Sequence, residues 1–154
     1  MRQIRLEKEQ HVDAKSTQEI LDKTSRGNSV VLNHWTQCGH CIMFKPEWEK
    51  FRKDMVGEKE LTLISIEMSA ARPLFSNSAI LQNKLSDQGQ LYFPMIIVFV
   101  DGKKYMYQGE RTAEALKKFY EAKRTVAKPR AAVVAKPKAQ PKAQSKAKAQ
   151  RKSI

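Results

Sequence analysis

The chain has 154 residues, which is long enough for one domain with a hydrophobic core. Its 29 Lys/Arg and 16 Asp/Glu residues give a formal net charge of +13. No apolar run approaches the ~20 residues that cross a bilayer, and the charged start lacks the apolar core of a secretory signal. We therefore expect a protein of the cytoplasm or nucleus without a membrane span.

The positive charge is concentrated at the C-terminal end. Residues 128–154 hold nine Lys/Arg and no acidic residue, whereas residues 1–127 hold 20 Lys/Arg and 16 Asp/Glu. Lys, Pro, Ala and Gln recur after residue 127 without apolar periodicity, so that segment cannot bury enough surface to order by itself. The sequence predicts a folded domain over 1–127 and a disordered or partner-bound basic tail over 128–154.

A short strand and a helix are predicted at the N-terminus. Ile4 and Leu6 alternate with polar neighbours, as in a strand with one buried face. Residues 13–23 have helical character, and Asp13 and Ser16 are both suitable N-caps.

A buried strand and a helix are predicted on either side of the two cysteines. Residues 29–35, "SVVLNHW", are apolar and rich in β-branched side chains, as in a buried strand. Apolar residues recur at helical spacing over 42–55, with Pro46 inside the pattern, which predicts a kinked helix.

The second half of the chain continues this alternation. We expect a strand at 61–68, a loop from 69 leading into a helix near 77–86, strands at 94–100 and 103–108, and a helix at 112–124. The Asp101-Gly102 pair is typical of a tight hairpin turn, which makes the last two strands antiparallel. The order β-α-β-α-β-α-β-β-α predicts an α/β fold, a central mixed β-sheet flanked by helices.

Both cysteines, Cys38 and Cys41, lie where the buried strand gives way to a helix. The free N–H groups and positive dipole end of a helix start stabilise a thiolate, so we expect the pKa of Cys38 below ~8.5. His40, if protonated, adds a second positive charge, while Gly39 allows a tight turn and keeps the first sulfur accessible. Cys41 should face the same way but be more buried, and the spacing permits a disulfide between the two.

This asymmetry predicts thiol–disulfide exchange. Cys38 attacks a substrate disulfide, and Cys41 then attacks the resulting mixed disulfide and releases the reduced substrate; the reverse reaction oxidises substrate thiols. A histidine beside the nucleophile favours an oxidant or isomerase. The expected partners are protein thiols and disulfides, and no cofactor or metal is required.

Other interpretations of the cysteine pair stay open. The two residues could be inert members of the core. A zinc site of His34, Cys38, His40 and Cys41 would supply suitable ligands, but all four lie within eight residues and no second half-site exists. Covalent haem attachment needs a histidine directly after the second cysteine, where this chain has Ile42.

Three motifs together resemble the thioredoxin superfamily, most closely a catalytic domain of protein disulfide isomerases. They are the "CGHC" tetrapeptide at 38–41, the helix proline Pro46, and "YFPMIIVFVDGKKYMYQGERTAEALKKFY" at 92–120. The resemblance covers about residues 1–125. It implies a thioredoxin-like fold.

The resemblance also implies residue roles. Cys38 would be the nucleophile and Cys41 the resolving thiol. The Phe93–Pro94 bond would be cis, and the backbone beside it would pair with an extended substrate.

The chain departs from the family pattern below the cysteines. The family usually keeps a buried acid six residues before the first cysteine, where this chain has Leu32, and the lysine partner of that acid falls near Ser65. Losing both avoids a lone buried charge but removes a proton relay, for which His34 or Glu67 are the candidate substitutes. The usual aromatic residue before the first cysteine is Gln37, so redox activity is expected to be slow or specialised.

A second hypothesis is a thioredoxin-fold structural or assembly protein anchored by its basic tail. Spaced Lys/Arg residues neutralise phosphates without reading sequence, so the tail would bind nucleic acid, another polyanion or an assembly partner. The chain resembles both the compact thioredoxin-like proteins and the lysine/proline-rich virion proteins that some large DNA viruses carry, which suggests a component of a virus particle.

Overall fold

The computed structural model describes residues 1–127, so the basic tail predicted at 128–154 lies outside the described residues. Residues 1–121 form one compact unit around a five-stranded sheet of order β1-β3-β2-β4-β5. The strands are β1 (Arg2–Leu6), β2 (Asn28–His34), β3 (Leu61–Glu67), β4 (Met95–Val100) and β5 (Lys103–Tyr107). β1, β3 and β2 pair in parallel, whereas β4 is antiparallel to β2 and to β5, which confirms the predicted mixed sheet.

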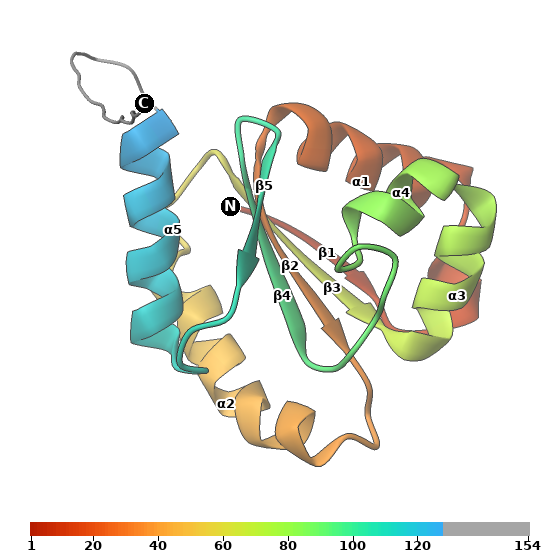
Figure 1. The fold of residues 1–154 in the computed structure, drawn as a ribbon, viewed down its shortest axis with the longest axis horizontal. Helices are drawn as coiled ribbons and strands as arrows, with labels where there is room; N and C mark the ends of the chain where they lie inside the picture. The colour runs from red at the N-terminus through yellow and green to blue at the C-terminus, as the bar shows by residue number, and fades with distance from the viewer. Residues whose placement is uncertain (128–154) are drawn as a thin grey trace, which may run out of the picture. The chain divides into compact units, whose positions relative to one another are not determined.

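Helices cover both faces of the sheet. They are α1 (Ala14–Arg26), α2 (Gly39–Asp54), α3 (Met68–Asn77), α4 (Ala79–Lys84) and α5 (Ala113–Ala127), with a short 3₁₀ turn η1 (Glu9–His11) before α1. Figure 1 shows α1, α3 and α4 on one side of the sheet, and α2 and the first turns of α5 on the other. Among the described residues, no helix is both long and apolar enough to cross a membrane.

The alternation of side chains along β2 decides what each face holds. Val31 belongs to the buried cluster under α1, α3 and α4, whereas Leu32 and His34 point to the side of α2 and line a cavity there. Burying one large apolar side chain is worth about 1.5–3 kcal/mol, so the apolar side chains buried on the two faces together stabilise the sheet strongly. The largest fully buried side chains include Ile20, Phe51, Ile64, Ile66, Leu74, Phe99 and Tyr120.

Reciprocal hydrogen bonds fix the start of α1. The Asp13 carboxylate accepts a hydrogen bond from the Ser16 N–H at 2.8 Å, and the Ser16 hydroxyl accepts one from the Asp13 N–H at 3.0 Å. Asp13 is therefore the N-cap and Ser16 its partner, so both predicted capping residues act at this helix start.

The loop expected from residue 69 is wrong, because residues 68–77 form α3. Ala70, Ala71 and Leu74 are buried against the sheet, and the Glu67 carboxylate caps the helix start. This burial outweighs the cost of Pro73 inside the helix. The helix predicted near 77–86 is the shorter α4.

The predicted Asp101-Gly102 turn joins β4 to β5. Asp101 has φ 52° and Gly102 has φ 80°, both in the left-handed region that suits a two-residue hairpin turn. Gly102 also packs against the end of α1, where a Cβ would lie 2.1 Å from the Ser25 backbone oxygen. This turn therefore needs glycine for two independent reasons.

Candidate active site

The two cysteines stand at the N-terminus of α2 with different exposure. Cys38 is the N-cap, with extended backbone, and its carbonyl oxygen accepts the Ile42 N–H at 3.0 Å. Cys41 lies in the first turn and is 8% exposed, whereas Cys38 is partly exposed. Both are free thiols, and the predicted difference in their accessibility is confirmed.

The surroundings of Cys38 favour its thiolate. Partial desolvation alone would raise the pKa of Cys38, but interactions with the Cys41 thiol and with the backbone N–H groups of Cys41 and His40 lower it. The positive charge of Arg111 acts in the same direction. The pKa of Cys38 therefore lies below its ordinary value, and the helix start supplies the N–H groups, as the sequence predicts.

Cys41 is held as a thiol. Burial raises the pKa of Cys41 to about 11, and the proximity of the Cys38 sulfur adds to the shift. Because only a thiolate is strongly nucleophilic, Cys41 needs a proton acceptor before it can attack a disulfide near neutral pH.

The Phe93–Pro94 segment comes beside the cysteines from another part of the chain. Its peptide bond is cis, which confirms the expectation from the resemblance. The Cys38 thiol donates a hydrogen bond to the Phe93 backbone oxygen at 3.5 Å. The Phe93 ring lies 6.5 Å from the Trp35 ring, and Pro94 is buried against the same cavity as Cys41.

Gly39 and His40 both lie in the first turn of α2. Gly39 is the first residue of α2, has no left-handed φ, and a Cβ there would meet no atom within 4 Å. A tight turn therefore does not require it, although it leaves open space beside Cys38. His40 is exposed, and its backbone N–H lowers the pKa of Cys38, whereas a contribution from the charge of its side chain stays a prediction.

Residue 32, six positions before Cys38, is not an acid. Leu32 is 5% exposed, and its register partner on β3 is Ser65, so the two departures predicted from the sequence lie side by side. The Ser65 hydroxyl instead shares a hydrogen bond of 3.1 Å with His34 Nε2. Glu67 is buried and accepts hydrogen bonds from the Thr36 N–H at 3.0 Å and from Ser69.

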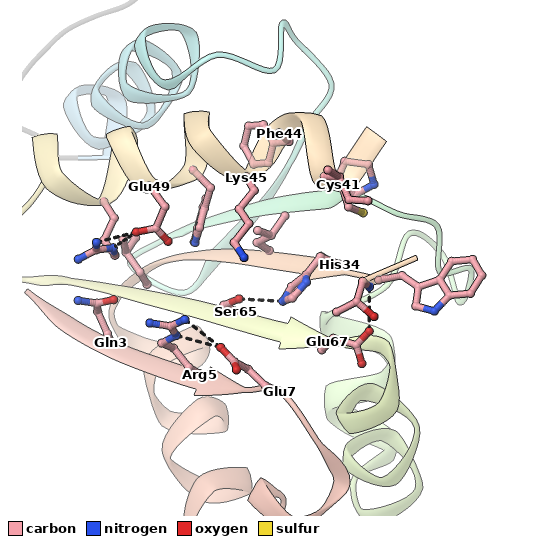
Figure 2. Close-up of a pocket in the computed structure, with 18 residues that line it drawn as sticks. Gln3, Arg5, Glu7, His34, Cys41, Phe44, Lys45, Glu49, Ser65 and Glu67 are labelled. Atoms are coloured by element: carbon pink, nitrogen blue, oxygen red, sulfur yellow. Dashed lines mark hydrogen bonds and ion pairs between the residues drawn. The ribbon is translucent and has the colours of Figure 1, made fainter. Parts of the chain in front are cut away.

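A cavity of about 340 Å³ opens between α2 and the strands β1, β3 and β2. Figure 2 shows Cys41 on the α2 wall, with His34 and Glu67 on the opposite wall formed by the sheet. The ion pairs Arg5–Glu7 and Arg52–Glu49 line the same space. Cys41 thus faces a cavity that is lined by both apolar and charged side chains and is large enough to hold water.

Arg111 is a candidate site residue that the sequence patterns did not single out. Its charge lowers the pKa of both Cys38 and Cys41. It also lines a hollow of about 290 Å³ together with Tyr92 and Pro94. The only signal in the sequence is the "YQGERT" segment, which contributes to the resemblance without indicating that its arginine faces the thiols.

The zinc alternative finds no support in this geometry. Within residues 1–127, no three His, Cys, Asp or Glu side chains form a group that could hold a metal ion, so His34, Cys38, His40 and Cys41 do not converge.

Known proteins share this fold and sequence pattern. A sequence model of the family described as Thioredoxin matches residues 8–122. The chain is 30% identical over 84 residues to "Protein disulfide-isomerase 2-3" of Arabidopsis thaliana, and 34% identical over 84 residues to "Protein disulfide isomerase-like 2-3" of Oryza sativa subsp. japonica. Each match covers 53% of this chain and 16% of the relative. The J-Trx1 fragment of ERdj5 is similar in structure, with a TM-score of 0.53, 19% identity, and 80% of this chain and 52% of that chain covered.

The fold and the paired thiols define a domain of the thiol–disulfide oxidoreductase class. The chain belongs to the thioredoxin family and is close to the domains of protein disulfide isomerases. It spans about a sixth of the length of the curated relatives that it matches.

Proposed function

We propose that this protein is an enzyme that forms, reduces or isomerises disulfides in protein substrates through Cys38 and Cys41. The observation that carries the proposal is the contrast between the two thiols. Cys38 is partly exposed and has a lowered pKa, whereas Cys41 is buried with a pKa of about 11. One sulfur is suited to attack a substrate, and the other is kept away from it.

In the reductive direction, the Cys38 thiolate attacks one sulfur of a substrate disulfide. A mixed disulfide forms, and the other substrate sulfur leaves as a thiolate. Cys41 then loses its proton and attacks the Cys38 sulfur, which releases the second substrate thiolate. The enzyme ends as the Cys38–Cys41 disulfide, and the same steps in reverse oxidise a substrate dithiol.

The surface around Cys38 supports an extended peptide as substrate. Ile42 and Met43 are 59% and 75% exposed on α2, and Tyr92 is exposed just before Phe93. Ile42 and Met43 follow Cys38 within five residues, and Tyr92 precedes the residue whose backbone oxygen contacts the Cys38 sulfur, so we propose that substrates present an unfolded apolar segment next to their cysteine.

Trapping of the mixed disulfide tests the proposed reaction. The Cys41→Ser variant should accumulate a covalent adduct with a disulfide-containing peptide, whereas Cys38→Ser should form none. The wild-type protein should reduce the peptide stoichiometrically and end with an internal disulfide. Equal turnover by the wild type and Cys38→Ser would overturn the proposal.

The direction of the reaction follows from the reduction potential of the couple. The stabilised Cys38 thiolate favours the reduced form, which supports oxidase or isomerase activity. Equilibration of the protein with glutathione redox buffers measures this potential. A value near the strongly reducing end would favour a reductase instead.

The absence of a charged pair at Leu32 and Ser65 favours a second candidate, a structural or assembly protein in which redox turnover is secondary. In this alternative, the positive charge of residues 128–154 attaches the domain to a polyanion in the cytoplasm, the nucleus or a virus particle. A variant lacking residues 128–154 discriminates between the two. The enzyme proposal expects unchanged thiol chemistry with or without the segment, whereas the alternative expects salt-dependent association with nucleic acid to be lost.

A further inference from the structure

The cavity beneath α2 is lined by both residues, His34 and Glu67, that the sequence left open as proton acceptors. Cys41 is buried from the outer surface but lines this cavity of about 340 Å³, which is large enough for several water molecules. His34 lies across the cavity from Cys41, at the end of β2 (Figure 2). A water molecule between the two walls can therefore connect the thiol with the imidazole.

The carboxylates around this cavity are already engaged. Glu7 is paired with Arg5 at 2.9 Å, and Glu49 is paired with Arg52 at 2.6 Å. Each of these acids therefore already has a cation beside it as its partner.

Glu67 is engaged as well. One of its oxygens accepts from the Thr36 N–H, and the other accepts from the N–H and hydroxyl of Ser69. These hydrogen bonds to the charged form lower the pKa of Glu67 despite its burial, so its carboxylate is a poor proton acceptor near pH 7.

His34 has a free acceptor atom. Its one hydrogen bond in residues 1–127 joins Nε2 to the Ser65 hydroxyl at 3.1 Å. When Nε2–H donates to that hydroxyl, the lone pair of Nδ1 is available to a proton.

The charges that face His34 come from three elements. Burial lowers the pKa of His34; Glu67 on β3 and Glu7 just after β1 oppose this shift, and Lys45 on α2 and Arg5 on β1 reinforce it. The pKa of His34 lies below its ordinary value as the balance of these effects. The imidazole is then neutral near pH 7 and able to accept a proton.

We propose that His34 is the positioning residue that takes the proton of Cys41 through water when the mixed disulfide is resolved. The inference rests on the proposed function. The Cys41 S–H proton passes by way of water to His34 Nδ1, and the Cys41 thiolate attacks the Cys38 sulfur. The Cys38–Cys41 bond forms, the Cys38–substrate bond breaks, and the substrate leaves as a thiolate. His34 then returns its proton to solvent.

Stopped-flow kinetics with dithiobis(nitrobenzoic acid), an aromatic disulfide that releases a coloured thiolate, separates the two attacks. With excess reduced protein, attack by Cys38 releases the first thiolate at a rate that depends on protein concentration. Attack by Cys41 releases the second thiolate at a rate that does not. In His34→Gln we expect the second phase to be about 100-fold slower at pH 7, with the first phase unchanged.

The pH dependence distinguishes a lost proton acceptor from a loosened structure. In the wild type, the second phase should stop rising with pH once His34 is neutral. In His34→Gln it should rise about tenfold per pH unit from about pH 6 to 9, because only the spontaneously ionised Cys41 reacts. A purely structural effect of the substitution would slow the second phase of His34→Gln by the same factor at every pH, without this change in slope.

The matched control is His11→Gln, which makes the same change at a histidine on η1 and should leave both phases unaltered. An unchanged second phase in His34→Gln would overturn this inference while leaving the proposed function intact. Release of only one thiolate per reagent by the wild type would overturn both. If Glu67→Gln, and not His34→Gln, produced the change in slope, the assignment to His34 would be wrong.

Discussion

The Sγ atom of Cys38 lies 3.5 Å from the backbone oxygen of Phe93, which is 55 positions further along the chain. The two residues meet because β2 leads into the cysteine loop while β4 begins directly after Pro94. These strands are antiparallel neighbours, and Asn33 at the end of β2 is paired with Met95 at the start of β4. The sheet register therefore sets the distance between the sulfur and the segment that faces it.

The two thiols should react with an alkylating agent in different pH ranges. A lowered pKa means that Cys38 is ionised at a lower pH than an ordinary cysteine, so its alkylation should begin first. Cys41, with a pKa of about 11, should stay unmodified near neutral pH. Iodoacetamide labelling followed by peptide mass spectrometry measures both rates; equal rates at pH 7 would contradict the assignment.

Arg111→Gln should raise the pKa of both cysteines. Removing the guanidinium removes a positive charge that stabilises each thiolate, so alkylation of Cys38 at pH 7 should slow severalfold. The decrease should itself become smaller at high salt, because part of the attraction acts through solvent. Lys53→Gln is the matched control. It also removes one positive charge, but at the other end of α2, and should leave the alkylation rate of Cys38 unchanged.

Leu32→Glu should destabilise the fold by about 3 kcal/mol at neutral pH, because it places a carboxylate where the present side chain is apolar and only 5% exposed. The pKa of the new carboxyl would be raised, so the penalty is small below about pH 4 and grows as the pH rises through the unfolded-state value. Urea denaturation at several pH values measures it.

Adding Ser65→Lys to Leu32→Glu tests whether an acid at position 32 and a lysine at position 65 interact. Leu32 and Ser65 are register partners on β2 and β3, so a lysine there can reach the new carboxylate. We expect Leu32→Glu/Ser65→Lys to recover about 1–2 kcal/mol relative to the sum of the single variants. Simple additivity of the two changes would show that the side chains do not meet.

Gly102→Ala should cost at least about 2 kcal/mol. The residue has φ 80°, and its new Cβ would meet the Ser25 oxygen at 2.1 Å, so either the hairpin or the end of α1 must move. Gly57→Ala is the matched control, since a Cβ there meets nothing within 4 Å. Thermal unfolding of both variants should show a loss for Gly102→Ala alone.

Much of the fold follows from local pattern. The apolar runs of β2, β3 and β4 and the Asp-Gly turn are signals confined to a few residues each, so these elements are predicted correctly. The helix α3 is different, because Pro73 and its polar neighbours indicate a loop. What stabilises it is burial of Ala70, Ala71 and Leu74 against strands that are distant in sequence.

Some features of the site also follow from local sequence, and others depend on the three-dimensional fold. The placement of Cys38 at a helix start and the greater burial of Cys41 follow from a motif between a strand and a helix. The action of Arg111 does not, because it depends on how the segment after β5 approaches α2. The choice between His34 and Glu67 also needed the structure, since the hydrogen bonds that occupy Glu67 come from separate loops and helices.

The central position of β2 has a consequence for motion at the site. The strand is hydrogen-bonded on both edges, to β3 and to β4. Its amide protons should exchange with deuterium only when the whole unit unfolds, whereas the exposed residues between Trp35 and Gly39 can fluctuate locally. We therefore expect the segment that carries Cys38 to exchange faster than β2 and the groups beneath it, so the same experiment would separate movement of the sulfur from movement of the sheet.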